Sequence, residues 1–314
     1  MPPAELTELH HLFIHAMLLR RAAPYEKWLA IWKKSAGIIG SRVSDNEFAQ
    51  FYGEINDRIA PFGFSIDILS DEGIGPIDLD QLESDPNNGQ RIRTKRWMAL
   101  VNTRSDDTAK LGTDFNPNEI ALYKKIVDRI ILSTNYRYCL SYHDCLRLTS
   151  TLQANIKKSE AEKLLTVLVE KGWLSKSKTG YYSLSIRSKL ELKSYIDENY
   201  NEEDRPPRCA ACREIVMRGF KCPNSECPKA MHVTCIINQN RQAHICPSCK
   251  SPFNYGVRIG EDAPKGRGRA TPNDEDGEGE DVSTQLSIEP TGGNRRSKRT
   301  RDQSIADRDE LSDD

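Results

Sequence analysis

Apolar side chains along the N-terminal third of the chain follow a helical period first and a strand period afterwards. They recur every three or four positions along residues 6–20, and again after Pro24, a residue that suits a helix start. Ser44 begins a capping-box pattern that opens a third helix. Alternating apolar residues at 64–68 and an apolar run at 97–101 then predict two strands. Three helices followed by a strand pair is the element order of a winged-helix domain.

The same order of elements recurs in the middle third of the chain. Asn116 precedes a proline and apolar residues at helical spacing, so it marks a helix start, and a shorter helix is expected near residues 141–152. Ser159 begins a second capping-box pattern, and Gly172 is expected to end that helix in left-handed geometry. Two short strands around a turn follow, and residues 187–200 are expected to form a trailing helix. We therefore predict a second winged-helix domain.

The outward face of the third helix in this second domain argues against sequence-specific DNA reading. Its exposed positions mix lysines with the acids Glu160, Glu162 and Glu170. A major-groove reader needs a basic or amide-rich face, because phosphate contacts dominate its affinity. We therefore expect the paired winged helices to dock proteins, and any DNA contact to be weak or indirect.

Composition divides the chain into parts. From residue 257 onward Gly, Asp, Glu, Ser, Pro and Arg dominate, and such a segment cannot bury enough surface to offset its ordering entropy. No run of about 18 apolar residues occurs, so no membrane-spanning helix is expected. The predicted fold is mainly α with small β wings. Its four parts are a winged-helix domain at 1–105, a second winged-helix domain at 106–200, a cysteine-rich zinc module at 205–256 and a disordered tail at 257–314.

The cysteines determine the chemistry of the third part. Seven of the nine lie with His232 in the spacing C-x2-C-x9-C-x4-C-x4-H-x2-C-x10-C-x2-C. Two tetrahedral zinc ions need eight ligands, and thiolates with a histidine select zinc over hard cations. The ligand pairs can be joined in sequence or crossed, and we expect the crossed order because it ties a short segment into one unit. In that order the first ion is held by Cys209, Cys212, His232 and Cys235, and the second by Cys222, Cys227, Cys246 and Cys249.

A disulfide framework is the competing interpretation of these cysteines. Residues 1–12 lack the basic-then-apolar layout of a secretory signal, and an intracellular pattern of this kind is more often metal-binding. The remaining cysteines, Cys139 and Cys145, lie in an apolar helical pattern and are expected to be buried thiols. We therefore predict two structural zinc ions in an intracellular chain.

The ligand order leaves two kinds of zinc module open, a RING-type module and a plant-homeodomain (PHD) histone reader. The closing pair, with Pro247 between Cys246 and Cys249, is typical of RING domains. A PHD finger usually has an aromatic residue two positions before its seventh ligand, where this chain has His244. Histone readers also use an aromatic cage for cations, and all four tryptophans lie outside the module. RING is favoured, and a PHD-like reader is the alternative.

A basic cluster within the tail has the composition of a nuclear import signal. Solvated tails also hold such clusters by chance, and we expect import in this case. Its cations are Arg295, Arg296, Lys298, Arg299 and Arg301.

Residues 1–256 resemble a known family, the non-SMC element one subunit of the SMC five–six chromosome-maintenance complex. The resemblance rests on paired winged helices followed by a zinc segment with histidine as its fifth ligand. The similar segments are Gly219-Phe220-Lys221-Cys222, Met231-His232-Val233-Thr234-Cys235 and Cys246-Pro247-Ser248-Cys249. It implies a nuclear ubiquitin ligase that acts in DNA repair, with a MAGE-family subunit, a kleisin subunit and a ubiquitin-conjugating enzyme as partners.

A RING ligase acts by positioning the loaded conjugating enzyme, so the resemblance implies no catalytic nucleophile or base in this chain. By position, the contacts with the conjugating enzyme or ubiquitin are Ala211, Ile236, Pro247 and Lys250. Ala211 stands where a bulky aliphatic residue is usual, and the tryptophan common after the sixth ligand is missing. We therefore expect weak activity without the MAGE-family partner. A non-catalytic scaffold is the alternative function.

Overall fold

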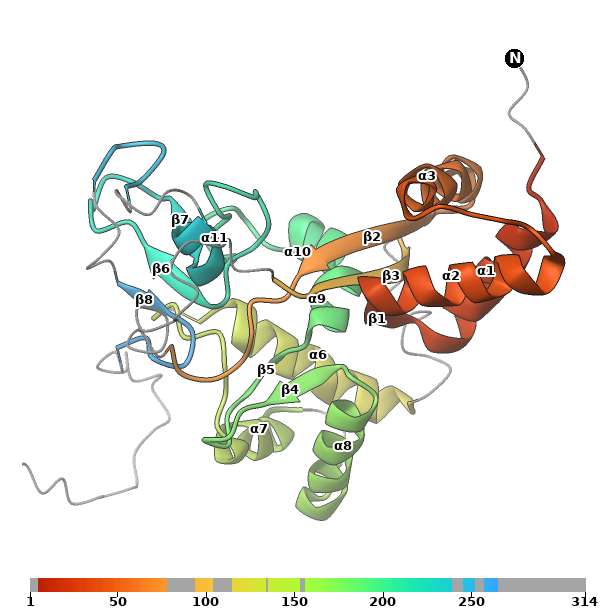
Figure 1. Ribbon diagram of the computed structural model, residues 1–314. Coiled ribbons are helices and arrows are strands. Elements are labelled where there is room, and N and C mark those ends of the chain that lie inside the picture. The colour runs from red at the N-terminus through yellow and green to blue at the C-terminus, as the bar shows by residue number, and fades with distance from the viewer. Residues whose placement is uncertain are drawn as a thin grey trace, which may run out of the picture. The chain divides into compact units, whose positions relative to one another are not determined.

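Figure 1 shows the computed structural model of the chain, which describes residues 5–77, 94–103, 115–133, 135–152, 156–238, 245–251 and 257–264. One compact unit comprises Met1–Gly268, and a second unit, Arg269–Asp314, lies outside the described residues. The disordered tail stays a prediction beyond residue 264, and the basic import cluster also lies outside the described residues. None of the described helices is both long and apolar enough to cross a bilayer.

The N-terminal domain has the predicted winged-helix order with an additional strand near its start. Its elements are α1 (Glu8–Arg20), β1 (Ala22–Pro24), α2 (Tyr25–Ile39), α3 (Phe48–Ile59), β2 (Phe64–Ser70) and β3 (Arg96–Asn102). The strands pair antiparallel in the order β1-β3-β2. Ser44 and Glu47 form the predicted capping box just ahead of α3. The helices pack on one face of the sheet around Phe13, Trp28 and Phe48.

Both faces of this first sheet are buried, which explains the nearly continuous apolar run in β3. Successive residues of a strand point to opposite faces. Met98 packs with the N-terminal helices, whereas Ala99 and Val101 pack with Leu190. Leu190 belongs to α9 (Ile186–Glu191), which follows the second winged helix. The first sheet is therefore also the surface on which the two winged-helix domains meet.

The second domain repeats the winged-helix order. Its elements are α6 (Pro117–Ile131), α7 (Tyr142–Arg147), α8 (Lys158–Glu170), β4 (Leu174–Lys176), β5 (Tyr182–Leu184), α9 and α10 (Lys193–Asn199). Asn116 caps α6 as predicted, since its side chain accepts the N–H of Glu119 at 2.9 Å. The predicted trailing helix is two short helices, α9 and α10, which meet at Leu192.

The start of α8 differs from the prediction. The capping-box interpretation of Ser159 is wrong, because the helix begins at Lys158 and its N-cap is Lys157. The N–H of Lys157 donates to the carboxylate of Glu160 at 3.1 Å, so the reciprocal acid is found two residues earlier than expected. At the other end Gly172 is left-handed, with φ 73°, as predicted.

The zinc module contains a small sheet that extends into the predicted tail. Its elements are β6 (Gly219–Lys221), β7 (Ala230–His232), α11 (Val233–Asn238) and β8 (Arg258–Ile259), with strand order β7-β6-β8. Residues 257–264 therefore belong to the fold, which corrects the prediction that the tail begins at residue 257. Ile259 is fully buried, and the N–H of Gly260 donates to the carbonyl of Tyr136 at 2.8 Å. Two buried apolar side chains, Ile259 and Ala263, are too small a signal to alter the polar composition of the segment.

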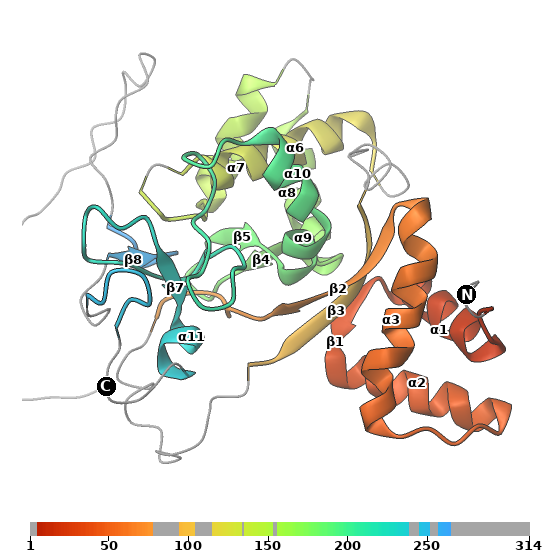
Figure 2. The same ribbon diagram turned by 90° about the horizontal axis from the view of Figure 1, so that it is seen from above.

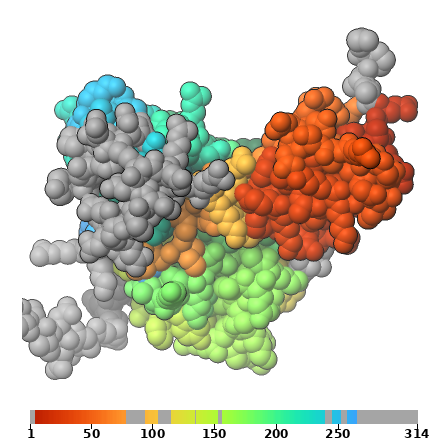
Figure 3. Space-filling view, in the orientation of Figure 1, coloured from red at the N-terminus to blue at the C-terminus, as the bar shows by residue number. Residues whose placement is uncertain are grey.

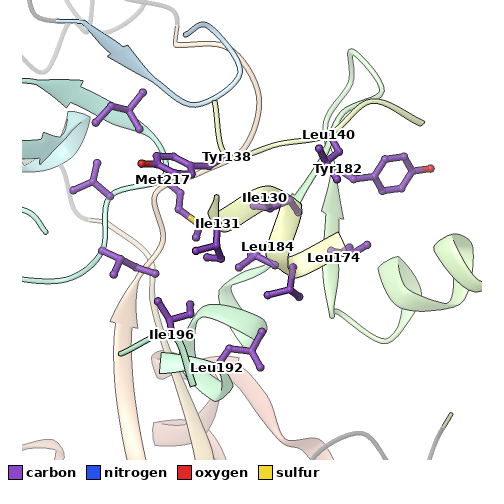
Figure 4. Close-up of a cluster of buried hydrophobic side chains, with 14 of the residues drawn as sticks. Ile130, Ile131, Tyr138, Leu140, Leu174, Tyr182, Leu184, Leu192, Ile196 and Met217 are labelled. Atoms are coloured by element: carbon purple, nitrogen blue, oxygen red, sulfur yellow. The ribbon is translucent and has the colours of Figure 1, made fainter. Parts of the chain in front are cut away.

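The second domain and the zinc module share one apolar core. Figure 4 shows Met217 of the module lying beside Ile131 and Tyr138 of the second domain, and these residues belong to the same buried cluster. Phe220 of β6 and Ile196 of α10 are in that cluster as well. Apolar packing against its neighbour therefore supports the module in addition to any bound metal.

The chain beyond β2 does not turn directly back into β3. Figures 1 and 2 both show it leaving β2 and running between the second domain and the zinc module. In Figure 3 its orange surface lies against the green surface of the second domain. Ile77 at the end of this run is buried in the shared core. Residues 71–77 thus enter the junction of the three domains, and we call them the junction segment.

Candidate metal centre

Two chain reversals of the same geometry carry the first and last ligand pairs. In each, the N–H of the residue after the pair donates to the carbonyl of the first cysteine, at 2.9 Å for Arg213 to Cys209 and at 2.9 Å for Lys250 to Cys246. The N–H of the first cysteine donates to the carbonyl of the residue five positions later, which is Glu214 at 2.8 Å in the first turn and Ser251 at 2.7 Å in the second. Arg213 and Lys250 are left-handed, with φ 66° and 63°. These turns point both thiols of each pair to the same side.

The middle ligands are placed by the small sheet and its helix. Cys222 directly follows β6 and Cys227 lies in the turn that leads to β7. His232 is the last residue of β7, and Cys235 lies in α11, which begins at the next residue after that strand. Strand pairing therefore sets the distance between the second and third ligand pairs.

The eight predicted ligands gather in the crossed order. One group consists of Cys209, Cys212, His232 and Cys235, and the other of Cys222, Cys227, Cys246 and Cys249; within each group the ligand atoms lie within 4.8 Å of one another. Zinc bonds of about 2.3 Å to sulfur and about 2.0 Å to nitrogen place tetrahedral ligand atoms about 3.5–3.8 Å apart.

Two sulfur–sulfur separations in the second group lie near those around a tetrahedral ion. The sulfurs of Cys222 and Cys249 are 3.3 Å apart, and those of Cys227 and Cys246 are 3.8 Å apart. A disulfide needs about 2.05 Å, and all of these cysteines are free. The residues present therefore fit two zinc ions, and the disulfide framework is not formed.

The ring of His232 has a defined orientation. Its Nδ1 lies 3.3 Å from the sulfur of Cys212 and 3.7 Å from that of Cys235, so this nitrogen faces the metal position. Its Nε2 lies 2.9 Å from the carbonyl oxygen of Ile215. Because a carbonyl only accepts, Nε2 carries the proton and Nδ1 is left free to bind a metal.

A carboxylate from another domain stands behind the same ring. Glu72 of the junction segment places its Oε1 3.7 Å from Nε2 of His232 and 3.0 Å from Nζ of Lys189. Burial alone raises the pKa of Glu72, but the ammonium of Lys189 and the N–H of His232 outweigh it and hold the pKa below its ordinary value. The first metal position therefore has a buried, charged carboxylate as an outer neighbour.

Sequence reasoning missed Glu72. It lies in the long excursion between the predicted strands of the first domain, and 160 positions separate it from His232 in the numbering. An Asp-Glu-Gly-Ile-Gly segment is typical of a solvated turn, and no local pattern connects it with a zinc ligand. Only the path of the chain brings the two together.

The predicted contacts with a conjugating enzyme or ubiquitin differ in exposure. Ala211 and Lys250 are exposed and Pro247 is half-buried, all three within the matched turns. The Nζ of Lys250 donates to the carbonyl of Pro247 at 3.2 Å. Ile236 is 9% exposed and belongs to the shared core, so its neighbour Ile237 offers more surface to a partner.

Other sequence candidates take no part in the metal groups. Cys139 and Cys145 are buried as predicted, and burial raises the pKa of the first to about 11 and that of the second to about 12. Phe220 is buried in the shared core, so it is not an exposed wall of an aromatic cage. His244, which distinguished the two zinc-module types, lies outside the described residues.

Two family models together match most of the chain. Residues 10–192 of the 314 match the model described as "Nse1 non-SMC component of SMC5-6 complex". Residues 209–249 match a model described as "RING-like domain", a range that begins at the first zinc ligand and ends at the last.

Curated relatives and a solved structure agree with these matches. The Xenopus laevis protein "Non-structural maintenance of chromosomes element 1 homolog" is 25% identical over 256 residues, covering 80% of this chain and 85% of the relative. The Homo sapiens homologue is 33% identical over 163 residues, covering 51% of this chain and 58% of the relative. A chain of a solved "Nse1-Nse3-Nse4 complex" has the same fold, with TM-score 0.63 and 24% identity over 81% of this chain and all of that chain.

Proposed function

The chain belongs to the Nse1 family of non-SMC components of the SMC5-6 complex, and on that premise we propose that it is a RING-type ubiquitin ligase subunit holding two structural zinc ions. The observation that carries the proposal is the crossed set of eight ligands in a RING-like segment. We place its action in the nucleus, in DNA repair and chromosome maintenance, because the family is defined by a chromosomal complex. The bound zinc ions supply folding free energy to the module.

The proposed mechanism is positioning, without a nucleophile in this chain. A ligase of this kind holds the ubiquitin-loaded conjugating enzyme so that its thioester meets an incoming lysine. The matched turns present Ala211 and Pro247 at the surface of the module, with the ammonium group of Lys250 beside Pro247. We assign the first two to contact with the conjugating enzyme and Lys250 to contact with ubiquitin.

We assign partner docking to the winged helices. The solved structure of similar fold is an Nse1-Nse3-Nse4 complex, and we equate Nse3 and Nse4 with the expected MAGE-family and kleisin subunits. In the first domain α1 exposes Leu18 and Leu19, at 56% and 90% of their full area. Adjacent exposed leucines on one helix are suited to a protein contact. We propose that the MAGE-family subunit covers this end of α1.

The deciding experiment is lysine-dependent discharge of ubiquitin from a panel of conjugating enzymes, with and without the MAGE-family subunit. We expect discharge that rises with the partner and falls at least tenfold in Pro247→Ala and in Lys250→Ala. Ser248→Ala, an exposed change between them, is the matched control and should discharge normally. Equal discharge by all three variants would contradict the assignment.

A scaffold without ligase activity is the second candidate, favoured by the small Ala211 and the burial of Ile236 at positions where ligases present large apolar contacts. It predicts no discharge with any enzyme, although the chain binds two zinc ions and assembles with its partners. Pull-down of the partner subunits by Cys249→Ser then separates the two: a scaffold loses assembly, whereas a ligase loses discharge first.

A further inference from the structure

We propose that Glu72, carried by the first winged-helix domain, is a positioning residue of the first zinc site and couples that site to the junction of the three domains. The inference concerns the metal site and the junction, so it stands or falls independently of ligase activity. Four sets of contacts carry it.

The carboxylate of Glu72 is saturated by donors from two other domains. Its Oε2 accepts the backbone N–H groups of Met217 and Arg218, at 2.9 Å and 2.7 Å. Its Oε1 accepts from Nζ of Lys189 at 3.0 Å. The side chains of Glu72 and Lys189 are 4% and 7% exposed. Both oxygens of this carboxylate therefore accept hydrogen bonds from described residues.

Arg218 holds the backbone of the same segment from the zinc module. Its guanidinium donates to the carbonyls of Glu72, Gly75 and Pro76, at 2.8, 2.9 and 2.8 Å. Gly73 is left-handed, with φ 74°, and a Cβ there would meet the guanidinium at 3.3 Å. The backbone of the junction segment is therefore shaped to receive the Arg218 side chain, while the Glu72 carboxylate in turn accepts the backbone N–H of Arg218.

The far end of the segment is held by the strand region after β8. The N–H of Ile77 donates to the carboxylate of Asp262, which also lies 3.8 Å from the guanidinium of Arg258. The zinc module thus contacts the junction segment at both ends, through Arg218 and through Asp262. Loss of either contact leaves the other in place.

His232 connects these contacts to the metal. Its Nδ1 faces the ion and its Nε2–H points to the carbonyl of Ile215, with Oε1 of Glu72 beyond at 3.7 Å. The acceptor behind a ligating histidine fixes its ring orientation, and loss of such a partner typically weakens metal affinity 10- to 100-fold. That acceptor is the carbonyl of Ile215, and Glu72 holds the backbone just after it through the N–H groups of Met217 and Arg218. The Glu72 carboxylate comes from a different domain. The same group therefore contributes both to the first metal site and to the packing of the junction.

A buried ion pair is a weak source of net stability, because desolvation offsets the attraction between the charges. The pair of Glu72 and Lys189 is better explained by what it positions. Glu72 fixes two backbone amides of the module just after Ile215, the acceptor of His232, and places a negative charge behind the ring, whereas an apolar residue of similar size could do neither.

The test is Glu72→Gln in the full chain. The amide would present its NH2 either to Nζ of Lys189 or to the backbone N–H groups of Met217 and Arg218, so donors would face donors in both orientations. We expect the first zinc ion to be released about tenfold faster to a chromogenic chelator. In the cadmium-substituted protein, the NMR resonance of the site with three sulfurs and one nitrogen should move while that of the all-sulfur site stays. Amide exchange at Met217 and Arg218 should rise.

Glu203→Gln is the matched control, since Glu203 is exposed and loses the same charge. Unchanged release, unchanged cadmium resonances and unchanged exchange at both amides in Glu72→Gln would overturn the proposal. Should that variant fold poorly, the coupling is measured in the wild-type chain. Coupling is reciprocal, so if the junction affects zinc binding at the first site, zinc binding must affect the stability of the junction. Stripping zinc should then raise amide exchange in residues 71–77, and unaltered exchange there would equally refute the coupling.

Discussion

The two metal positions share a turn geometry but differ in what stands behind them. The first and last ligand pairs lie in turns with the same hydrogen bonds and the same left-handed residue after the second cysteine. The first position contains the histidine, whose outer face contacts Ile215 and Glu72. The second is built from four cysteines of the module itself. The comparison indicates that one position is local to the module and the other is tied to the remaining domains.

The largest expected effect is loss of a ligand. Cys246→Ser should release both zinc ions and unfold the module, because the ligands of the two sites alternate along the chain. Structural zinc contributes roughly 10–16 kcal/mol per site in zinc-finger peptides. Zinc content measured by atomic absorption should fall from two ions to none. Retention of one ion would show that the two sites are independent of each other.

Chelation should divide the cysteines into two sets. With zinc removed at pH 8, alkylation should reach the seven ligand cysteines and spare Cys145, whose burial raises its pKa to about 12. Mass spectrometry of the alkylated peptides gives the result directly. Labelling of Cys145 together with the ligands would mean that the shared core collapses with the module.

A smaller effect is expected from Gly219→Ala, which distorts the strand pair that places His232 and Cys222. Gly219 pairs with His232 across β6 and β7, and a Cβ there would lie 2.2 Å from the carbonyl oxygen of Met231. Overpacking of this kind typically destabilises by about 1–3 kcal/mol. Gly53→Ala in α3 is the control, because nothing lies within 4 Å of its added Cβ. Denaturant unfolding should show a loss for the first change and none for the second.

The smallest expected effect sharpens the comparison between the turns. Arg213→Gly and Lys250→Gly each place glycine at a left-handed position, where another residue costs about 1 kcal/mol. Both should therefore raise the chelator concentration needed for zinc release by a similar small factor. Only Lys250→Gly should reduce ubiquitin discharge. Equal discharge by both variants would remove Lys250 from the ubiquitin contact.

Features that depend on residues close together in the sequence could be predicted from the sequence. The eight ligands lie within a short segment, so their spacing was enough to predict the donor set. The crossed order was expected because it ties that segment into one unit, and the structure gathers the side chains in the same two groups. Caps set by neighbouring residues, such as Asn116 and Ser44, were predictable for the same reason. Lys157 was not, since a lysine N-cap supplies no side-chain acceptor and the pattern at Ser159 was stronger.

Contacts between distant residues were outside the reach of sequence patterns. Glu72 and Lys189 are 117 positions apart, and neither lies in a motif. The strand β8 was not predicted, because a two-residue strand in a polar segment has no hydrophobic periodicity. The burial of Ile236 likewise depends on the neighbouring domain, because its packing partners are brought by the shared core.

That shared core limits how the protein can be dissected. A fragment beginning at residue 205 would follow the change in composition, yet it would leave Met217 and Phe220 without the side chains of the second domain that cover them. Such a fragment is expected to aggregate or to adhere to unrelated proteins and membranes, although its zinc ligands are intact. Binding measured with the isolated module would then reflect a hydrophobic surface exposed by the truncation. Truncations that retain residues 5–264 keep Ile77 and the other members of the shared core and are the safer reagents.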